Sequence, residues 1–421
     1  YHKDPERKVL PLLAKYKVAE QTNASCIKSK LGIPHFLLPE KFNATTDVPQ
    51  YDFDFRNGQL LLNTARTLIS SEDVQVAIDR LDALFDVIIN LVVLAYVTLV
   101  RMWLLGYVPW WISIPAFSIL RTAIAGGGHY YVHRKKPYWR DVFFDINYVG
   151  MAYTAQDGHV LLHHMFTQSD ADVKRGFFGG MMGVPRLLRI FAHTLHKLGH
   201  VTTGMLIRGF EVEIEIDSDE HQGVPRYTRT KFGRFANWSF WAMHLWLRLE
   251  LALAIICGVG WSWLGQFCLC LWLNTLMVVS SHDFTEQYDQ DTKDWARYQL
   301  LNAHDLSIVG NPWIDVFLTA GLSPHRAHHV FPYQKSGFAN IYSGHFLAQA
   351  AKKHSLPWAP PKNFFTEIFP HIVQTYLWSP VADPIDRVPR YESFFAEHSA
   401  LIVYKYTLAY IWAGFMGIGS L

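Results

Sequence analysis

The sequence predicts an all-α integral membrane protein, with four transmembrane helices in two hairpins and a helical cap on one side of the membrane. About half of the 421 residues are hydrophobic and only 18% are charged, against about a quarter in typical soluble proteins. The 15 Trp and 20 Tyr residues are types that concentrate at membrane–water interfaces. Long apolar runs also come in pairs, each pair split by a short uncharged break.

The N-terminal residues 1–83 predict an extramembrane region, because their composition is mixed and polar. Within this region, residues 59–80 show helical periodicity with charges on one face, which indicates a helix on or near the membrane surface. Asn23 and Asn43 begin glycosylation triplets, but such triplets are common by chance.

Four apolar runs follow, and each comes close to the roughly 20 residues that a membrane-spanning helix needs. The breaks at Gly106–Pro109 and at Gly258–Gly260 turn them into two hairpins. Arg248 and Glu250 lie inside the third run, so we expect them to face the bundle interior or to pair. The predicted spans are 84–105, 108–128, 238–257 and 261–281.

The short uncharged linkers place the remaining segments, 1–83, 129–237 and 283–398, on one side of the membrane. A weaker apolar run from Ala400 to Leu421 is interrupted by Tyr404–Tyr406, which favours an interfacial helix over a fifth span. We therefore divide the chain into an N-terminal region, a membrane domain and a C-terminal region. Their bounds are 1–83, 84–332 and 333–421.

Nine histidines fall on that one side, in three clusters and one single position at the end of the fourth span. A lone histidine near an interface is usually a satisfied polar residue, but repeated spacings of three or four residues let imidazoles approach one ion. Imidazole suits iron, copper, zinc and nickel, and one such ion takes about four to six ligands. The set predicts two metals: His129, His133, His159, His163, His164, His282, His325, His328 and His329.

These motifs resemble those of the membrane fatty acid desaturase superfamily, whose members are integral-membrane non-haem di-iron enzymes with three histidine boxes. "HYYVH" from His129 resembles the first box, "HVLLHH" from His159 the second and "HRAHHVFP" from His325 the third. The resemblance runs from about Leu84 to about Pro332. It implies that His282 completes the iron ligands.

The resemblance leaves some positions open. Some relatives carry Asn four residues before the histidine that ends the fourth span, where this chain has Val278. One ligand position, which a water could fill, therefore stays open. His304, in "LNAHDLS", is a reserve ligand in place of His282. Asp170 and Asp172 could orient ligand histidines or be solvated loop charges.

Two further motifs have plainer interpretations. "HTLHKLGH" places His193, His196 and His200 on one helix face, and we interpret it as an amphipathic surface helix rather than a fourth box. The run Gly126–Gly128 lacks a phosphate-loop context, so it predicts a flexible helix end. Trp103, Trp111 and Trp246 either line a substrate tunnel between the spans or anchor the helices at the interface.

The resemblance implies a fatty acyl or lipid desaturase that uses O2, two irons and two external electrons. The chain lacks motifs for haem, iron–sulfur, flavin or nicotinamide binding, so a separate donor such as a b-type cytochrome or a ferredoxin is expected. The net charge of +2 does not suggest nucleic acid. Two alternatives stay open: a hydroxylase on the same scaffold, and a structural or lipid-binding subunit of a larger membrane complex.

The expected location is an integral membrane position, in the endoplasmic reticulum by default. Because the chain begins at Tyr1 without a Met, import into an organelle is compatible with it, and the mitochondrial inner membrane is the alternative. The four cysteines do not predict a disulfide framework or a zinc site.

Overall fold

The computed structural model describes residues 59–134, 143–149, 159–160, 163–168, 179–204, 238–282, 293–379 and 400–416. The chain divides into two compact units. We call residues 49–156 and 245–368 the bundle unit, and residues 1–48, 157–244 and 369–421 the smaller unit. The predictions for Asn23, Asn43, Asp170 and Asp172 lie outside the described residues.

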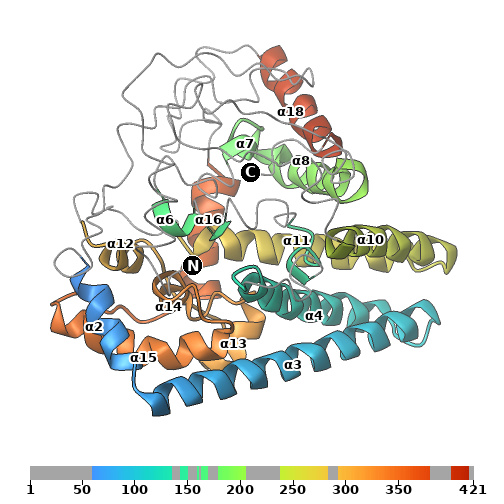
Figure 1. Ribbon diagram of the computed structural model, residues 1–421. Coiled ribbons are helices and arrows are strands. Elements are labelled where there is room, and N and C mark those ends of the chain that lie inside the picture. The colour runs from blue at the N-terminus through green and yellow to red at the C-terminus, as the bar shows by residue number, and fades with distance from the viewer. Residues whose placement is uncertain are drawn as a thin grey trace. The chain divides into compact units, whose positions relative to one another are not determined.

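Long helices dominate the bundle unit. They are α3 (Glu72–Leu104), α4 (Trp110–Tyr131), α11 (Gly260–Ser280) and the part of α10 (Trp238–Ile256) that follows His244. Helix α4 packs against both α3 and α11 (Figure 1). The mostly helical fold confirms the all-α prediction at this level. The described strands, β1 (Leu306–Ser307) and β2 (Lys362–Asn363), pair in parallel over two residues each.

The predicted membrane domain begins at residue 84, and α3 runs through this position. Helix α2 (Leu60–Ile69) is separate, and α3 begins at Glu72 after Ser71. Glu72 and Asp73 in the first turn interact favourably with the positive end of the helix dipole. Further along, the Ser336 hydroxyl donates to the Asp82 carboxylate at 2.6 Å, so this charged residue of α3 is paired.

Shorter helices pack around one end of this bundle. Helix α15 contacts α2 and α3, α13 contacts α4, and α14 contacts α12 and α15. Three of them have side-chain N-caps, Asp294 for α12, Asn311 for α13 and Ser336 for α15, which satisfy backbone N–H groups of the first turn. The bounds are α12 Trp295–Leu301, α13 Pro312–Leu318, α14 His325–Val330, α15 Gly337–Lys353 and the π-helix η6 Phe364–Ile368.

Within the described residues, two helices, α3 and α11, are long and apolar enough to cross a membrane by length and composition. Helices α4 and α10 stand at the other two predicted spans but fall outside that group. Arg121 and the glycine run lower the hydropathy of α4, and Arg248 and Glu250 lower that of α10. The four-span, two-hairpin layout therefore stays a prediction.

The glycine run is a packing surface rather than the flexible helix end we predicted. All three glycines lie within α4 and are buried. A Cβ added at Gly126 would lie 2.8 Å from the backbone nitrogen of Gly321, and one at Gly128 would lie 2.4 Å from that of Phe144. Other backbone segments therefore approach α4 closely, and only glycine leaves room for them.

The tryptophans separate into inner and outer positions. The indole N–H of Trp103, which is buried, donates to Ser262 at 3.1 Å. Trp246 donates to the hydroxyl of Tyr96 at 3.0 Å. Trp111 is 61% exposed, so its side chain does not line the bundle interior, and the interface-anchor alternative fits it better.

The smaller unit contains α8 (Arg186–Gly199) packed against α18 (Ala400–Phe415). Its other described elements are α6 His164–Phe166, α7 Gly179–Met182, η5 His200–Gly204, α16 Phe369–Ile372, η7 Val373–Leu377 and the first residues of α10. The predicted membrane domain 84–332 is therefore divided between the two units. The reason is that a helix from the middle of the chain packs with the C-terminal one, which sequence proximity cannot indicate.

The histidine face of α8 is buried rather than turned to solvent. Nδ1 of His193 lies 2.7 Å from the hydroxyl of Tyr410, and Nδ1 of His196 donates to the Tyr410 carbonyl at 2.7 Å. The opposite face exposes Leu187 and Phe191. The helix is amphipathic as predicted, but its polar face packs against α18.

Candidate metal centre

Three histidines from the first and third boxes converge in the bundle unit. His129 lies in the last turn of α4, His133 follows it one turn later, and His328 comes from α14. One ligand nitrogen from each lies within 4.8 Å of those of the other two. The ring of His328 is 4.4 Å from that of His129 and 4.7 Å from that of His133. This spacing suits three imidazoles around one ion.

A second group lies beside the first, and two of its three histidines also come from α14. The Nε2 atoms of His325 and His329 are 3.1 Å apart. The ring of His282, which follows α11, lies 4.6 Å from that of His325 and 4.8 Å from that of His329. The i, i+4 spacing on α14 places His325 and His329 on one face, and the bundle brings His282 to them.

Polar partners outside this second group orient its rings. Nδ1 of His329 donates to the side-chain oxygen of Gln299 at 2.8 Å, and Nδ1 of His282 donates to the backbone carbonyl of Asn302 at 2.8 Å. A proton on Nδ1 leaves the Nε2 lone pair for a metal, as is usual for metal-binding histidines. Both partners come from the segment around α12, which is buried.

A buried ion pair fixes α14, the helix that carries three of these histidines. The Asp305 carboxylate accepts from the backbone N–H of Arg326 at 2.8 Å and from its guanidinium at 2.6 and 2.9 Å. The Tyr130 hydroxyl donates to the carbonyl of Gly321 at 2.7 Å just before the helix. Pro332, which follows soon after, prevents the helix from continuing. The six-residue helix is therefore held at its N-terminal end and ends at Val330.

The second histidine box lies in the smaller unit, and its three histidines are buried together. The rings of His159 and His163 are 5.3 Å apart, and Nε2 of His164 is 3.4 Å from Nε2 of His159. The hydroxyl of Thr167 donates to the His163 carbonyl at 2.6 Å. The predicted ligand set is thus found as six histidines in one unit and three in the other.

His304, the reserve ligand, belongs to neither ligand group found among the described residues. Its backbone N–H donates to the Ser281 carbonyl at 3.0 Å, which holds it beside the end of α11. Burial lowers the pKa of its imidazole to about 4, so the ring is neutral at pH 7. The geometry favours His282 over His304 as the ligand.

Sequence reasoning missed the residues that support the histidines. Gln299, Asn302 and Asp305 are spaced three apart in "WARYQLLNAHDLS" and are all buried. Three polar residues at helical spacing, between the fourth apolar run and the third histidine box, are the signal that could have found them.

The donor set fits iron. Imidazoles from separate segments meet in a buried region, and no carboxylate belongs to the groups found among the described residues. Imidazole nitrogen is a suitable ligand for first-row metals including iron. Two adjacent groups of three rings in the bundle unit are what a two-metal centre requires from this part of the chain.

Residues 103–358 match the model of the fatty acid desaturase family. The chain belongs to the fatty acid desaturase family. Membership implies oxidoreductase chemistry in the broad sense, and the family commonly uses iron. Together with the two apolar helices, it points to membrane association. No curated protein and no solved structure gives a significant match to the chain.

Proposed function

We propose that this desaturase-family chain is a fatty acyl or lipid desaturase with a di-iron centre, using O2 and two electrons from an external donor. The observation that carries the proposal is the convergence of six box histidines in two adjacent groups within the bundle unit. A structural protein has no need to bury so many imidazoles together, because each buried polar group must find a partner.

Under this proposal all nine box histidines hold the irons. His129, His133 and His328 contribute to one site, His282, His325 and His329 to the other, and the second box completes both. The remaining ligands are His159, His163 and His164. When bound, two irons with O2 supply the oxidant needed to remove hydrogen from an unactivated methylene, chemistry that side chains alone cannot perform.

The side chains of the bundle prepare this site in three ways. Gln299 and Asn302 hold the Nδ1 protons of His329 and His282, so the rings cannot rotate freely. Asp305 neutralises Arg326 beside them without placing a net charge at the site. Complete burial of His328 and His329 excludes bulk water, which would otherwise quench a reactive oxidant.

We also propose that α3, α4, α10 and α11 cross the membrane as two hairpins. Their outward side chains are large and apolar, including Leu94 on α3 at 63% exposed and Ile256 on α10 at 78%. The charged side chains of Arg121 on α4 and Glu250 on α10 are buried and paired with each other. Apolar outside and polar inside is the distribution expected of helices surrounded by lipid.

The α8–α18 pair supports an interfacial location for the smaller unit. Arg189 and Lys197 are buried, whereas Leu187 and Leu408 are 76% and 68% exposed. Helix α18 has 16 residues and is about 24 Å long, shorter than the roughly 30 Å core of a bilayer. We propose that both helices lie in the membrane surface with their apolar faces toward acyl chains.

The partners under this proposal are an acyl chain or lipid as substrate and a b-type cytochrome or ferredoxin as electron donor. The location is an integral membrane one, the endoplasmic reticulum by default or the mitochondrial inner membrane. All segments outside the spans face one side, so donor and metal centre meet there.

Metal analysis and product analysis test the proposal. We expect two irons per chain in the purified protein, and an alkene product when a reconstituted donor, O2 and acyl lipids are supplied. An alcohol product would assign the chain as a hydroxylase on the same scaffold. Iron without turnover of any lipid would favour the structural or lipid-binding subunit, and one zinc or no metal would remove the di-iron proposal.

A further inference from the structure

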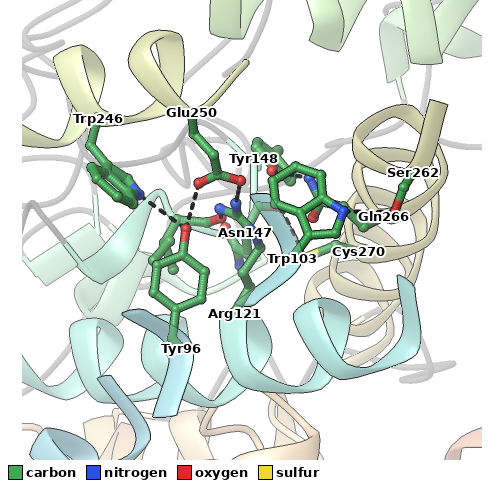
Figure 2. Close-up of polar contacts among 11 residues, drawn as sticks. Tyr96, Trp103, Arg121, Asn147, Tyr148, Trp246, Glu250, Ser262, Gln266 and Cys270 are labelled. Atoms are coloured by element: carbon green, nitrogen blue, oxygen red, sulfur yellow. Dashed lines mark hydrogen bonds and ion pairs between the residues drawn. The ribbon is translucent and has the colours of Figure 1, made fainter. Parts of the chain in front are cut away.

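A fully buried ion pair joins α4 to α10. Arg121 and Glu250 are 0% and 1% exposed, and their guanidinium and carboxylate are in direct contact (Figure 2). Replacing such a pair by well-packed apolar residues is often neutral or even stabilising. Stability alone therefore does not explain it, and ionisable residues inside membrane helices commonly serve a function.

The pair holds a third segment in place. Nη1 of Arg121 donates to the backbone carbonyl of Ile146 at 2.9 Å, and its guanidinium lies 4.6 Å from the centre of the Tyr148 ring. The other oxygen of Glu250 accepts from the hydroxyl of Tyr96 at 2.6 Å. Glu250 thus orients the Arg121 side chain. Arg121 in turn binds residues 146 and 148, in the segment that follows the first histidine box.

Residues 143–149 are fastened at two further points. Nδ2 of Asn147 donates to the side-chain oxygen of Asn274 at 3.1 Å. Nε2 of Gln266 donates to the Tyr148 hydroxyl at 2.5 Å (Figure 2). Asn274 and Gln266 both belong to α11. The segment is therefore clamped between α4 and α11, and every one of these side chains is buried.

The beginning of the same segment lies against a histidine of the metal centre. The ring of Phe144 stacks on that of His129 with centroids 6.2 Å apart, and its backbone fits against Gly128. Arg121 precedes His129 by eight residues on α4, which is about 12 Å. The segment thus runs alongside α4 from the level of the ligand to the level of the arginine.

We propose that Arg121, oriented by Glu250, is a positioning residue for the metal centre. Its hydrogen bond to the Ile146 carbonyl holds residues 143–149 against α4. Phe144, held in this way, fixes the orientation of the His129 ring. The inference rests on the proposed function, because it assigns a role toward the metal. Outer contacts that orient ligand histidines typically account for 10–100-fold in metal affinity.

The test is the paired substitution Arg121→Met with Glu250→Met, which leaves no buried charge unpaired. Metal-free protein in lipid nanodiscs is titrated with Co²⁺ and followed by absorption. We expect one of two cobalt equivalents to bind about 10–100-fold more weakly, with the other unchanged. Ser262→Ala is the matched control, since it removes the hydrogen bonds with Trp103 and Ser113 in the same bundle and should keep both affinities.

A conservative variant guards against misfolding. Arg121→Lys keeps the charge opposite Glu250 but cannot fork to the Ile146 carbonyl as well. It should insert normally and weaken the same cobalt equivalent by a smaller factor. Wild-type affinity for both equivalents in the double variant and in Arg121→Lys would overturn the inference, as would equal weakening in Ser262→Ala.

A readout without metal separates this inference from the proposed function. In metal-free protein with 4-fluorophenylalanine at Phe144, the fluorine resonance should shift and broaden in the double variant and stay unchanged in Ser262→Ala. Wild-type protein that binds no cobalt would remove the proposed function. The fluorine spectrum then tests by itself whether Arg121 positions Phe144. An unchanged spectrum in the double variant would overturn this role of Arg121.

Discussion

At the scale of single residues, the metal centre depends on which nitrogen of each imidazole is free. His282 and His329 donate Nδ1–H to oxygens of Asn302 and Gln299, and that choice turns Nε2 inward. His328 differs, because it stands between His129 and His133 and joins the third box to the first. Substituting a ligand histidine should therefore reduce metal binding more than substituting a residue that only orients a ligand.

His328→Ala should abolish turnover and remove at least one iron, while the protein still inserts into membranes. A missing ligand costs orders of magnitude in rate, whereas helix insertion depends on apolar length and packing. Iron content and activity with a reconstituted donor measure both effects. His345→Ala, on the exposed side of α15, is the control and should leave both unchanged. Near-normal iron in His328→Ala would show that the ligand set is wrong.

Gln299→Leu should weaken metal binding about 10–100-fold without abolishing it, because the His329 ring loses the acceptor that orients it. Gln299→Glu keeps an acceptor for Nδ1 and should retain most of the affinity. Co²⁺ titration compares the two variants. If Leu and Glu at this position bind cobalt equally well, the hydrogen bond from His329 has no role in positioning.

At the scale of elements, close backbone approach and buried polar faces decide how helices pair. Helix α4 carries three successive glycines against three different neighbours, Gly321, Ile89 and Phe144. Helices α8 and α18 pair in the smaller unit through His193, His196 and Tyr410. A single substitution tests the close packing of α4, and a change of pH tests the pairing of α8 with α18.

Gly128→Ala should destabilise the bundle unit by about 1–3 kcal/mol, the usual cost of overpacking, or more. The new Cβ would lie 2.4 Å from the backbone nitrogen of Phe144, and backbone cannot rotate aside. Gly344→Ala in α15 is the matched control, since its Cβ meets nothing closer than 3.8 Å and should stabilise by up to about 1 kcal/mol. Thermal unfolding in detergent measures the stability of both variants. Equal stabilities would contradict the close packing of Gly128 against Phe144.

Acid should loosen the α8–α18 pair. Burial, reinforced by the nearby charge of Lys197, lowers the pKa of His196 to about 3 and that of His193 well below its usual value. Tyr410 faces both rings from α18. A histidine with a lowered folded pKa binds fewer protons folded than unfolded, so its contribution is intact above about pH 6.5 and is lost as pH falls toward the folded value.

Hydrogen exchange of residues 186–204 and 400–416, corrected for intrinsic chemistry, measures this loss. Each fully buried histidine should cost about 1.4 kcal/mol per pH unit below about pH 6.5, and His196→Asn should flatten the dependence. Protection that stays constant between pH 7.5 and 4.5 would contradict the buried, neutral state of both rings.

At the scale of the whole molecule, the proposed topology puts every segment that bears a box histidine on one side of the membrane. The two turns between the paired long helices face the other side. Cys257 lies in the second of these turns and is exposed, whereas Cys270 is buried. A native thiol thus reports on the side opposite the metal centre.

In sealed, oriented vesicles, a membrane-impermeant maleimide should label Cys257 from one side only. His345→Cys, in a chain without Cys26, Cys257, Cys268 and Cys270, should label only from the other. Helix insertion with uncharged turns is the physical reason, since the polar segments cannot cross the bilayer core. Labelling of both positions from the same side would refute the two-hairpin topology.

The sequence by itself determined the features that depend on near neighbours. Apolar length indicated the helices α3, α4, α10 and α11, and the i, i+4 spacings indicated which histidines share a face, because helix geometry fixes contacts within about four residues. The motifs also carried the family resemblance, which the match over residues 103–358 confirms.

Only the tertiary structure decided what distant segments do to each other. It brought His282 rather than His304 to His325 and His329, paired Arg121 with Glu250, and packed α8 against α18. It also turned an apparent flexible glycine run into a close-packed surface. These outcomes depend on how the chain reverses between helices. Contacts between separate segments of the chain leave no local periodicity in the sequence to reveal them.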